Sequence, residues 1–328
     1  MRIIISPSGN LYGSENVLYD YLKNSSVKFN QVFVPKGSQF ETKLNKSGYN
    51  TFGFSNVKKL YLKIIWLLLS NNIRSIYCNE AGHVKYILLL AKYFPNVNFI
   101  IHVRIIEDTA RFVKNSQNVR VISISKTIKK RISVPSNLIY DGYEFKKMAN
   151  WATRKESQIL KIGVVGRVTK SKGINLFTKQ FIEIAGSNIE FHFFGDIDSY
   201  FEKSEEFKKL KNISNSIFHG FISDKSNIYC AVDLLLHLNE NEPLGRIFFE
   251  SIDFGKPFLG IHSGGIGEIS DLIEYPYTFS KEEIPFILNQ IVNNEIEFDL
   301  DKLENSRKLA LDAFSINSYS VQVDKLLK

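Results

Sequence analysis

Two glutamates flank a segment that has the chemistry to bind a phosphorylated ligand. Glu242 and Glu250 follow a strand-like run at 233–238. Pro243 suits a first helical turn and Gly255 suits a helix end, so we expect a helix that begins at the carboxyl edge of a parallel sheet. Open α/β sheets bind their ligands at that edge.

The first turn of this predicted helix is suited to an anion. N–H groups near Leu244 and Gly245 would lack intrahelical acceptors, and glycine has no Cβ to keep a ligand away. Helix starts of this kind bind phosphate groups. We therefore predict a phosphate site between the two glutamates.

The spacing of the glutamates argues against hydrolysis of a glycosidic bond. Eight helical residues would separate the Cα atoms of Glu242 and Glu250 by about 12 Å. The carboxyl groups of glycosidases lie roughly 5 to 9.5 Å apart. We predict that each glutamate binds a different part of one extended ligand, with a diphosphate between them. A plainer interpretation stays open, in which one is a solvated loop residue and the other lies on a helix surface.

Strand-like runs alternate with helical patterns along the chain. The runs lie at 2–6, 31–35, 75–79, 98–103, 119–125, 137–142, 159–166, 189–195, 233–238 and 258–261. This alternation predicts βαβ units, hence parallel sheets covered on both faces. A length of 328 residues suits two such domains. We place them at 1–150 and 151–304, joined by a polar linker at 148–158, with a terminal helix at 305–328.

The carboxyl-terminal half carries motifs that resemble those of one enzyme family. Glu242 and Glu250 frame a Gly-Arg pair, and Phe-Gly-Lys-Pro at 254–257 and Ser-Gly-Gly-Ile-Gly-Glu at 263–268 follow. This pattern is similar to that of the retaining glycosyltransferases of family 4, which have the GT-B fold. The resemblance implies two Rossmann-like domains facing a cleft, with a last helix that packs back onto the first domain.

The resemblance implies roles for residues of the second domain. Gly166, Arg167 and Lys172 lie in a loop similar to the family's phosphate clamp. A guanidinium and an ammonium also suit a diphosphate leaving group on physical grounds. Glu242 would hold sugar hydroxyls near the leaving group, and Glu250 would accept hydrogen bonds from the ribose.

Three further residues enter the predicted site through the same resemblance. His102 ends a strand and would contact the donor sugar, although a lone histidine is more often structural. The turn that contains Ile222 would present its backbone to the nucleobase. Gly13 lies in a loop that would fold over donor and acceptor, and it fits a plain turn equally well.

Charge is distributed unevenly along the chain. Residues 1–150 contain 22 Lys and Arg against 8 Asp and Glu, a net +14, and the remainder has 20 against 26, a net −6. The basic half favours anionic partners such as lipid phosphate, a membrane surface or nucleic acid, unless its lysines only solubilise the chain. Residues 58–69 could contact a membrane as a basic amphipathic element. Arg104 and Arg111 are weaker candidates for an acceptor phosphate.

Several other kinds of site are disfavoured. Cys78 and Cys230 form no CxxC pair, which is typical of a reducing cytosol. The longest uncharged apolar run, at 64–69, is too short to span a membrane, so we expect a cytoplasmic protein, at most peripheral on the inner face of the membrane. Asp196 and Asp198 resemble the Asp-x-Asp metal signature of the other glycosyltransferase fold only superficially. We expect no metal, and no cofactor beyond the nucleotide-sugar co-substrate.

These residues together predict a retaining glycosyltransferase of the hexosyltransferase type. It would move a sugar from a nucleoside diphosphate sugar to a hydroxyl of a saccharide or lipid-linked saccharide, in the assembly of cell-surface polysaccharide or glycolipid. The donor would lie on the second domain and the acceptor on the basic first domain. A GT-B nucleotide-sugar epimerase or glycoside phosphorylase stays open as an alternative. A non-catalytic polyanion binder fits less well because RNA-binding signatures are lacking, so nucleic acid is not an expected partner.

Overall fold

Short strands rich in isoleucine, valine and phenylalanine form the two centres of the fold. The computed structural model describes residues 1–112, 116–147, 149–151, 159–174, 178–184, 188–293 and 295–327. The chain divides into unit 1, Met1–Glu144 with Phe314–Lys328, and unit 2, Phe145–Ala313. The predicted linker at 148–158 falls mostly on residues outside the described ranges.

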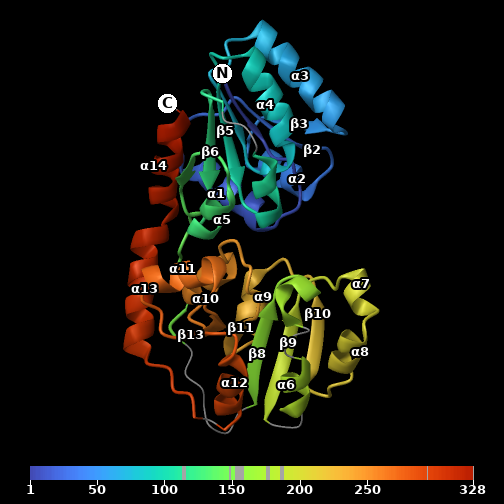
Figure 1. Cartoon of the computed structure of the whole chain (residues 1–328), viewed down its shortest axis with the longest axis vertical. Coiled ribbons are helices and arrows are strands. Elements are labelled where there is room, and N and C mark those ends of the chain that lie inside the picture. Colours follow the sequence, from blue (N-terminus) through green and yellow to red (C-terminus); the bar gives the residue numbers. More distant parts are fainter. Residues whose placement is uncertain are drawn as a thin grey trace. The chain divides into compact units, whose positions relative to one another are not determined.

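Unit 1 is built on a seven-stranded parallel sheet (Figure 1). The strands lie in the order β3-β2-β1-β4-β5-β6-β7, and every pairing is parallel. Their bounds are β1 Arg2–Ile5, β2 Gln31–Pro35, β3 Thr51–Phe54, β4 Ser75–Cys78, β5 Asn98–Val103, β6 Val119–Ser123 and β7 Ser136–Leu138. The central strands are buried along their length, as parallel strands covered on both faces must be.

Helices connect and cover these strands. They are α1 Gly13–Asn24, α2 Gln39–Lys46, α3 Val57–Ser70, α4 Val84–Tyr93, α5 Lys126–Arg131 and α14 Ile316–Leu327, with 3-10 turns η1 Ala81–His83 and η2 Ile106–Arg111. Side-chain caps set several helix starts. The side chains of Ser38, Asn56 and Ser125 each accept a hydrogen bond from a backbone N–H in the first turn of α2, α3 and α5, respectively.

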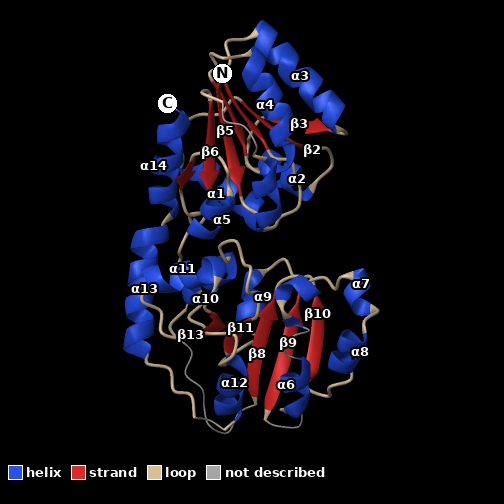
Figure 2. Cartoon of the chain, in the orientation of Figure 1, coloured by secondary structure: helices blue, strands red, loops and turns tan. Residues whose placement is uncertain are grey.

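Unit 2 repeats the plan with a six-stranded parallel sheet in the order β10-β9-β8-β11-β12-β13. Its strands are β8 Leu160–Val165, β9 Ile189–Phe194, β10 Ser216–Gly220, β11 Leu234–His237, β12 Phe258–Ile261 and β13 Thr278–Phe279. Its helices are α6 Thr178–Glu183, α7 Ser199–Glu202, α8 Glu205–Lys211, α9 Lys225–Tyr229, α10 Arg246–Asp253, α11 Gly264–Leu272, α12 Ile284–Val292 and α13 Leu300–Phe314, with the 3-10 turn η3 Lys170–Lys172. Figure 2 shows helices beside the strands of each sheet, so the predicted α/β architecture of two parallel-sheet domains is confirmed.

The end of the chain completes unit 1. Tyr319 and Val323 of α14 are buried in the same apolar core as Ile4 of β1. Gly142 makes room for this helix, because a Cβ there would lie 2.6 Å from the Cβ of Tyr319. Asp324 anchors the helix by accepting hydrogen bonds from several groups of α1 and the turn after it.

The preceding helix, α13, belongs to unit 2. Arg307, 2% exposed, donates to the carbonyl oxygens of Ile252 and Ala149 and holds α13 there. The chain therefore enters unit 1 again at Phe314, later than the residue 305 at which we placed the terminal helix.

Candidate functional site

The switch point of the unit 2 sheet positions the candidate site. Neighbouring strands β8 and β11 are separated in sequence by β9 and β10, so chain order reverses between them. Loops that leave such a pair open a crevice that binds ligands in α/β sheets. Residues 166–173 follow β8 and residues 238–245 follow β11, so the two predicted loops leave neighbouring strands.

Two glycines shape the loop after β8. Gly166 has φ +129° and Gly173 has φ +74°, angles that residues with a Cβ rarely adopt. A Cβ on Gly173 would also lie 2.0 Å from the carbonyl oxygen of Leu238. The loop therefore passes directly against the end of β11, and this contact brings Lys172 to Glu242.

Glu242 is held by three side chains that all approach one of its oxygens. Its Oε2 accepts hydrogen bonds from Nζ of Lys172 at 2.7 Å and from Nδ2 of Asn239 at 2.7 Å. Nε2 of His237 lies 3.3 Å from the same oxygen. The carboxylate is 15% exposed. Because these contacts all use Oε2, the second oxygen retains its capacity to accept hydrogen bonds from a ligand.

The neighbours of Glu242 also fix its charge. Burial alone would raise its pKa, but contacts with His237 and Lys172 outweigh burial and hold the pKa of Glu242 well below its usual range. An ionised carboxylate accepts hydrogen bonds and has no proton to give. The arrangement therefore suits a group that grips hydroxyls rather than a general acid.

Helix α10 begins later than its sequence suggested. Gly245 adopts φ +102° and ψ 61° as the N-cap, which stops the helix from extending back to Pro243. The first turn of the helix accordingly begins at Arg246 rather than at Leu244. Leu244 is 4% exposed and covered by Gly265 of α11, where a Cβ would lie 2.2 Å from the Cα of Leu244. The loop before α10 is thus clamped against the start of α11.

Glu250 lies on α10 among three donors. Its Oε1 contacts Nζ of Lys225 at 2.5 Å and Nε of Arg246 at 3.3 Å, and its Oε2 accepts from the hydroxyl of Tyr229 at 2.7 Å. Burial would raise the pKa of Glu250, but Lys225 and Arg246 lower it below its usual value. A carboxylate has about four acceptor positions, so a ligand hydroxyl could bind beside these donors.

The remaining predicted residues of unit 2 follow β8 and β10, which are separated in the sheet by β9. Arg167 is exposed and precedes η3, which ends at Lys172. Ile222 is half-buried and follows β10, two residues after Gly220 with φ +68°. Strands β8, β10 and β11 therefore each contribute a predicted residue at their carboxyl ends.

His102 lies inside unit 1. Its ring is 0% exposed, and its Nδ1 lies 2.8 Å from the hydroxyl of Tyr77 and 3.2 Å from Nη2 of Arg104. A guanidinium only donates, so Nδ1 accepts and the ring proton is on Nε2, 3.7 Å from Oδ1 of Asp141. Burial and the charge of Arg104 hold the pKa of His102 well below its usual range. We expected this ring to point toward a ligand, but in the structure it is enclosed by its own unit.

Arg104, a weaker candidate for an acceptor phosphate, is likewise enclosed. It is 6% exposed, and its Nη1 donates to Oδ2 of Asp141. Its Nε donates to the carbonyl oxygen of Asn79 at 3.0 Å. The other arginine, Arg111, is exposed and pairs with Asp108 at 2.8 Å.

Gly13 is the first residue of α1 and is exposed. The hydroxyl of the next residue, Ser14, lies 3.0 Å from Oε2 of Glu15 and 2.5 Å from Oε1 of Glu80. Burial raises the pKa of Glu80. The turn therefore lies at the carboxyl ends of β1 and β4, the switch point of the unit 1 sheet.

Sequence reasoning missed the residues that hold the two glutamates. His237 and Asn239 lie at the carboxyl end of β11, and Lys225 and Tyr229 lie on the short helix α9. The position of His237 at the end of a buried strand could have indicated that it lies beside Glu242. No residue spacing in the segment of α9 indicated that Lys225 and Tyr229 would contact Glu250.

The Asp-x-Asp sequence at 196–198 has a structural explanation. Among the described residues, no group of three or more His, Cys, Asp and Glu side chains could hold a metal ion. Asp198 of the Asp-x-Asp sequence caps α7 by accepting from the N–H groups of Tyr200 and Phe201. This capping gives Asp198 a structural role.

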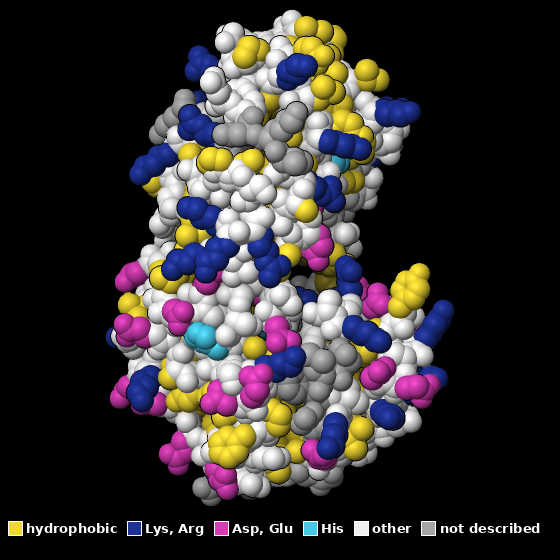
Figure 3. Space-filling model, in the orientation of Figure 1, with side chains coloured by type: hydrophobic (Ala, Val, Ile, Leu, Met, Phe, Trp, Pro, Cys, Tyr) yellow, Lys and Arg dark blue, Asp and Glu magenta, His cyan; other side chains and the backbone are white. Residues whose placement is uncertain are grey.

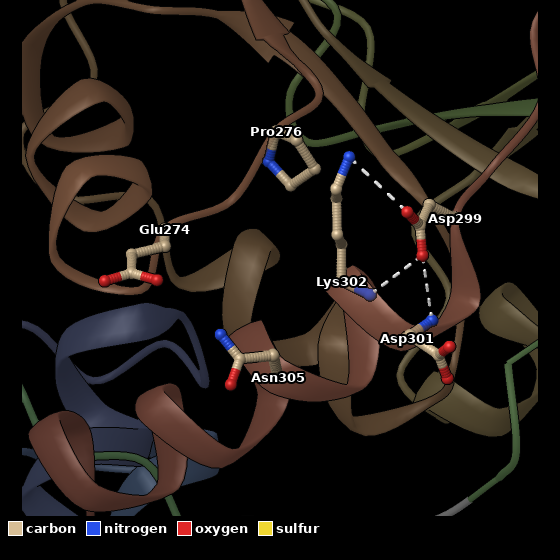
Figure 4. Close-up of a pocket in the computed structure, with 6 residues that line it drawn as sticks. All are labelled: Glu274, Pro276, Asp299, Asp301, Lys302 and Asn305. Carbon is tan, nitrogen blue, oxygen red and sulfur yellow. Dashed lines mark hydrogen bonds and ion pairs between the residues drawn. The ribbon is translucent and has the colours of Figure 1, made fainter.

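A cavity of about 550 Å³ lies elsewhere in unit 2 (Figure 4). It is lined by Glu274, Pro276, Asp299, Asp301, Lys302 and Asn305. Asp299 caps α13 through the N–H groups of Asp301 and Lys302 and pairs with Nζ of Lys302 at 3.4 Å. The start of α13 thus accounts for Asp299 and Lys302, and the cavity contains none of the predicted site residues.

The chain is similar to known proteins in part of its sequence and in its fold. Residues 146–272 match the family model described as Glycosyl transferases group 1. The fold resembles that of Anabaena Alr3699/HepE in complex with UDP and glucose, at 17% identity and TM-score 0.78 over 99% of this chain and 98% of that one. A glycosyltransferase from Rickettsia africae ESF-5 aligns at 16% identity and TM-score 0.77 over 100% and 97%.

The lipopolysaccharide outer core galactosyltransferase WaaB is also similar, at 17% identity and TM-score 0.71 over 100% of this chain and 99% of that one. No curated protein matches by sequence. Residues 146–272 thus match the Glycosyl transferases group 1 family, and the chain as a whole has the fold of GT-B glycosyltransferases.

Proposed function

We propose that this chain transfers a sugar from a nucleoside diphosphate sugar, with a uridine nucleotide as the first candidate, to a hydroxyl of a saccharide or lipid-linked saccharide. The arrangement of Glu242 carries the proposal. One oxygen is held by Lys172, Asn239 and His237, and the other is left for a ligand. The match of residues 146–272 supports it, as do the UDP complexes of the Anabaena protein.

Each part of the site has a role in this reaction. Breaking the anomeric bond builds negative charge on the diphosphate. Arg167, Lys172 and the N–H groups at the start of α10 would stabilise that charge as it develops, which lowers the barrier. Glu242 would hold sugar hydroxyls through its free oxygen, and Glu250 would accept from the ribose hydroxyls. Gly166 would let the backbone approach the diphosphate, because a Cβ there would have mostly open space around it. The left-handed conformation of Gly245 sets the start of α10, which would lie beside the diphosphate, and the turn at Ile222 would border the base.

The finer features of the proposal rest on the motif resemblance. Transfer of a hexose would proceed with retention of the anomeric configuration, without a metal, in polysaccharide or glycolipid assembly. Unit 1 would bind the acceptor. His102 would act there through its contacts with Arg104 and Tyr77, since its ring is buried.

Nucleotide binding is the first test. Calorimetric titration with UDP, and thermal shifts with UDP-sugars, should show binding, because a ligand well above its dissociation constant stabilises the fold by about 2.7 kcal/mol or more. Glu250→Ala should weaken binding, because it removes the predicted ribose acceptor. A matched control is Glu282→Ala, at an exposed glutamate of unit 2.

Turnover of the donor with and without acceptors separates the candidate reactions. A glycosyltransferase requires the acceptor, whereas an epimerase consumes the donor alone and a phosphorylase requires inorganic phosphate. Proton NMR of the product then reads the anomeric configuration. If no nucleotide or nucleotide sugar binds, the proposed function is wrong.

A further inference from the structure

Helix α3 of unit 1 is apolar on its outer side. Leu60, Ile64 and Leu67 face the core, as expected of a covering helix. On the opposite side, Leu62, Trp66 and Leu69 are 67%, 55% and 75% exposed, at the spacing of one helix stripe. A surface helix normally carries polar residues there, so a second contact surface is present.

Helix α4 extends this surface. Leu89 and Tyr93 are 55% and 67% exposed. The rings of Tyr61 on α3 and Tyr86 on α4 stack with centroids 4.6 Å apart, which places the two helices side by side (Figure 1). We call Leu62, Trp66, Leu69, Leu89 and Tyr93 the apolar ridge. Contiguous exposed apolar surface of this kind marks interaction sites.

The charges around the ridge identify its partner. The segment 57–93 contains six Lys and Arg and a single acid, Glu80, which is half-buried and contacts Ser14. Nζ of Lys63 lies 3.8 Å from the ring centroid of Trp66. Figure 3 shows hydrophobic and basic side chains intermingled over this part of unit 1. Tryptophan, leucine and lysine in one stripe are typical of helices that lie in the surface of an anionic bilayer.

A basic cavity follows the end of α3. It measures about 250 Å³, and its lining includes Arg2, Asn30, Asn72 and Arg74, with no carboxylate. Nε of Arg2 is buried without a hydrogen-bond partner among the described residues. Guanidinium groups in such a setting bind phosphate well. Asn72 and Arg74 lie two and four residues beyond the last residue of α3, so the cavity suits a lipid headgroup phosphate.

From these observations we propose that the outer surface of α3 and α4 docks unit 1 on a membrane rich in anionic phospholipid. At 14 residues, α3 is too short to cross a bilayer, and none of the described helices is long and apolar enough to do so. The helix would therefore lie in the interface with the ridge among the acyl chains and the lysines at the headgroups. This inference does not depend on the catalytic proposal.

Vesicle binding by the full chain tests the inference. Phosphatidylcholine vesicles with and without phosphatidylglycerol are sedimented with the protein at low and high salt. We expect binding to the anionic vesicles only, weakened by salt because exposed charges are screened. In a Trp151→Phe background, emission from Trp66 should shift to shorter wavelength as the ring leaves water. Absence of sedimentation with anionic vesicles at low salt would overturn the proposal.

Matched variants assign the binding to the ridge. Leu62→Glu with Leu69→Glu should abolish sedimentation, whereas Phe286→Glu, at a 61% exposed position of α12 in unit 2, should not. Replacing Lys58 and Lys59 with glutamine should lower the partition coefficient about fivefold per lysine, the factor that corresponds to about 1 kcal/mol. Melting temperatures establish that each variant is folded.

Two results would contradict docking on lipid. Unchanged binding in the double leucine variant would show that the ridge is not the contact. A concentration-dependent dimer that is lost in the same variant, with no vesicle binding by the wild-type chain, would assign the ridge to a second copy of the protein.

Discussion

Glu242 combines burial and a lowered pKa with one oxygen to which no described residue donates a hydrogen bond. Its three neighbours come from η3, from the end of β11 and from the loop that follows it. Such a carboxylate is pre-oriented, so a ligand hydroxyl meets an acceptor that needs little rearrangement. Lys172 serves both this carboxylate and, in the proposed reaction, the diphosphate.

Lys172→Ala should therefore impair turnover more than binding. We expect kcat to fall by about a hundredfold, since the ammonium acts on charge that develops in the transition state. The control is Lys170→Ala, because Lys170 is exposed in the same turn and should change kcat by less than about twofold. Steady-state kinetics with the donor found by titration make the comparison. Equal losses in both variants would remove Lys172 from the mechanism.

His102 should make the protein sensitive to mild acid. Its pKa is lowered in the folded state, so below about pH 6.5 the unfolded chain binds a proton that the folded chain does not. The free energy of unfolding then falls with decreasing pH by up to about 1.4 kcal/mol per pH unit.

Urea unfolding at about pH 7.5 and about pH 5.5 measures this loss. His102→Phe should reduce the difference between the two pH values, and His262→Phe, at a side chain that is 41% exposed, should leave it unchanged. The same pH dependence in all three proteins would show that His102 is not its source.

The contact between α11 and the loop before α10 is close enough to forbid a side chain. A Cβ on Gly265 would meet backbone atoms of Leu244 at 2.2 to 2.6 Å. Gly265→Ala should therefore displace the loop, weaken UDP binding and destabilise the chain by about 1–3 kcal/mol. Gly82→Ala is the control, because a Cβ there meets nothing within 4 Å. Titration calorimetry and thermal melting read both effects, and full UDP affinity in the Gly265 variant would refute the argument.

The carboxylate of Asp324 joins α14 to the end of α1 and the turn after it. Burial would raise the pKa of Asp324, but hydrogen bonds from Ser25, Ser26 and Tyr21 lower it. Its contribution to stability is therefore present above the unfolded pKa of about 3.9 and is lost as the pH falls through the lower folded value.

Asp324→Asn tests this anchor. The variant should lose about 1–3 kcal/mol near neutral pH, because buried donors lose their acceptor. Asp312→Asn, at an exposed position of α13, should change stability little. Thermal melting of the two variants makes the comparison, and equal melting temperatures would show that α14 is held mainly by its apolar face.

The sequence predicted the strands and the two loops well, because alternating strand and helix patterns and glycine positions are local signals. It placed the start of α10 too early, since Gly245 adopts a left-handed conformation close against Ile266 of α11, and neither feature is a local sequence signal. It could not foresee that His102 is buried, because Tyr319 and Tyr77 reach it from distant parts of the chain. Contacts between residues that are separated in the sequence, such as the hydrogen bond from Tyr229 to Glu250, produce no periodic pattern from which they could be predicted.

The two halves of the chain differ in net charge and in the candidate binding surface that each one carries. The basic half carries the apolar ridge, and the acidic half carries the candidate nucleotide site. UDP should therefore slow amide hydrogen exchange in residues 166–173 and 239–250 and leave α3 and α4 unchanged. Exchange measured by mass spectrometry with and without UDP checks this expectation. Adenosine monophosphate serves as the control ligand, and protection confined to unit 1 would place the nucleotide site elsewhere.

The return of the chain to unit 1 also affects the order in which the two units can be completed during synthesis. The core around Ile4 is completed by Tyr319 and Val323, and the polar cluster of Arg104 receives the hydroxyl of Tyr319. Translation therefore delivers every residue of unit 2 before unit 1 has its last helix. Until α14 is synthesised, the apolar residues of unit 1 that it covers lack these partners, and transiently exposed surface of this kind favours aggregation and chaperone binding.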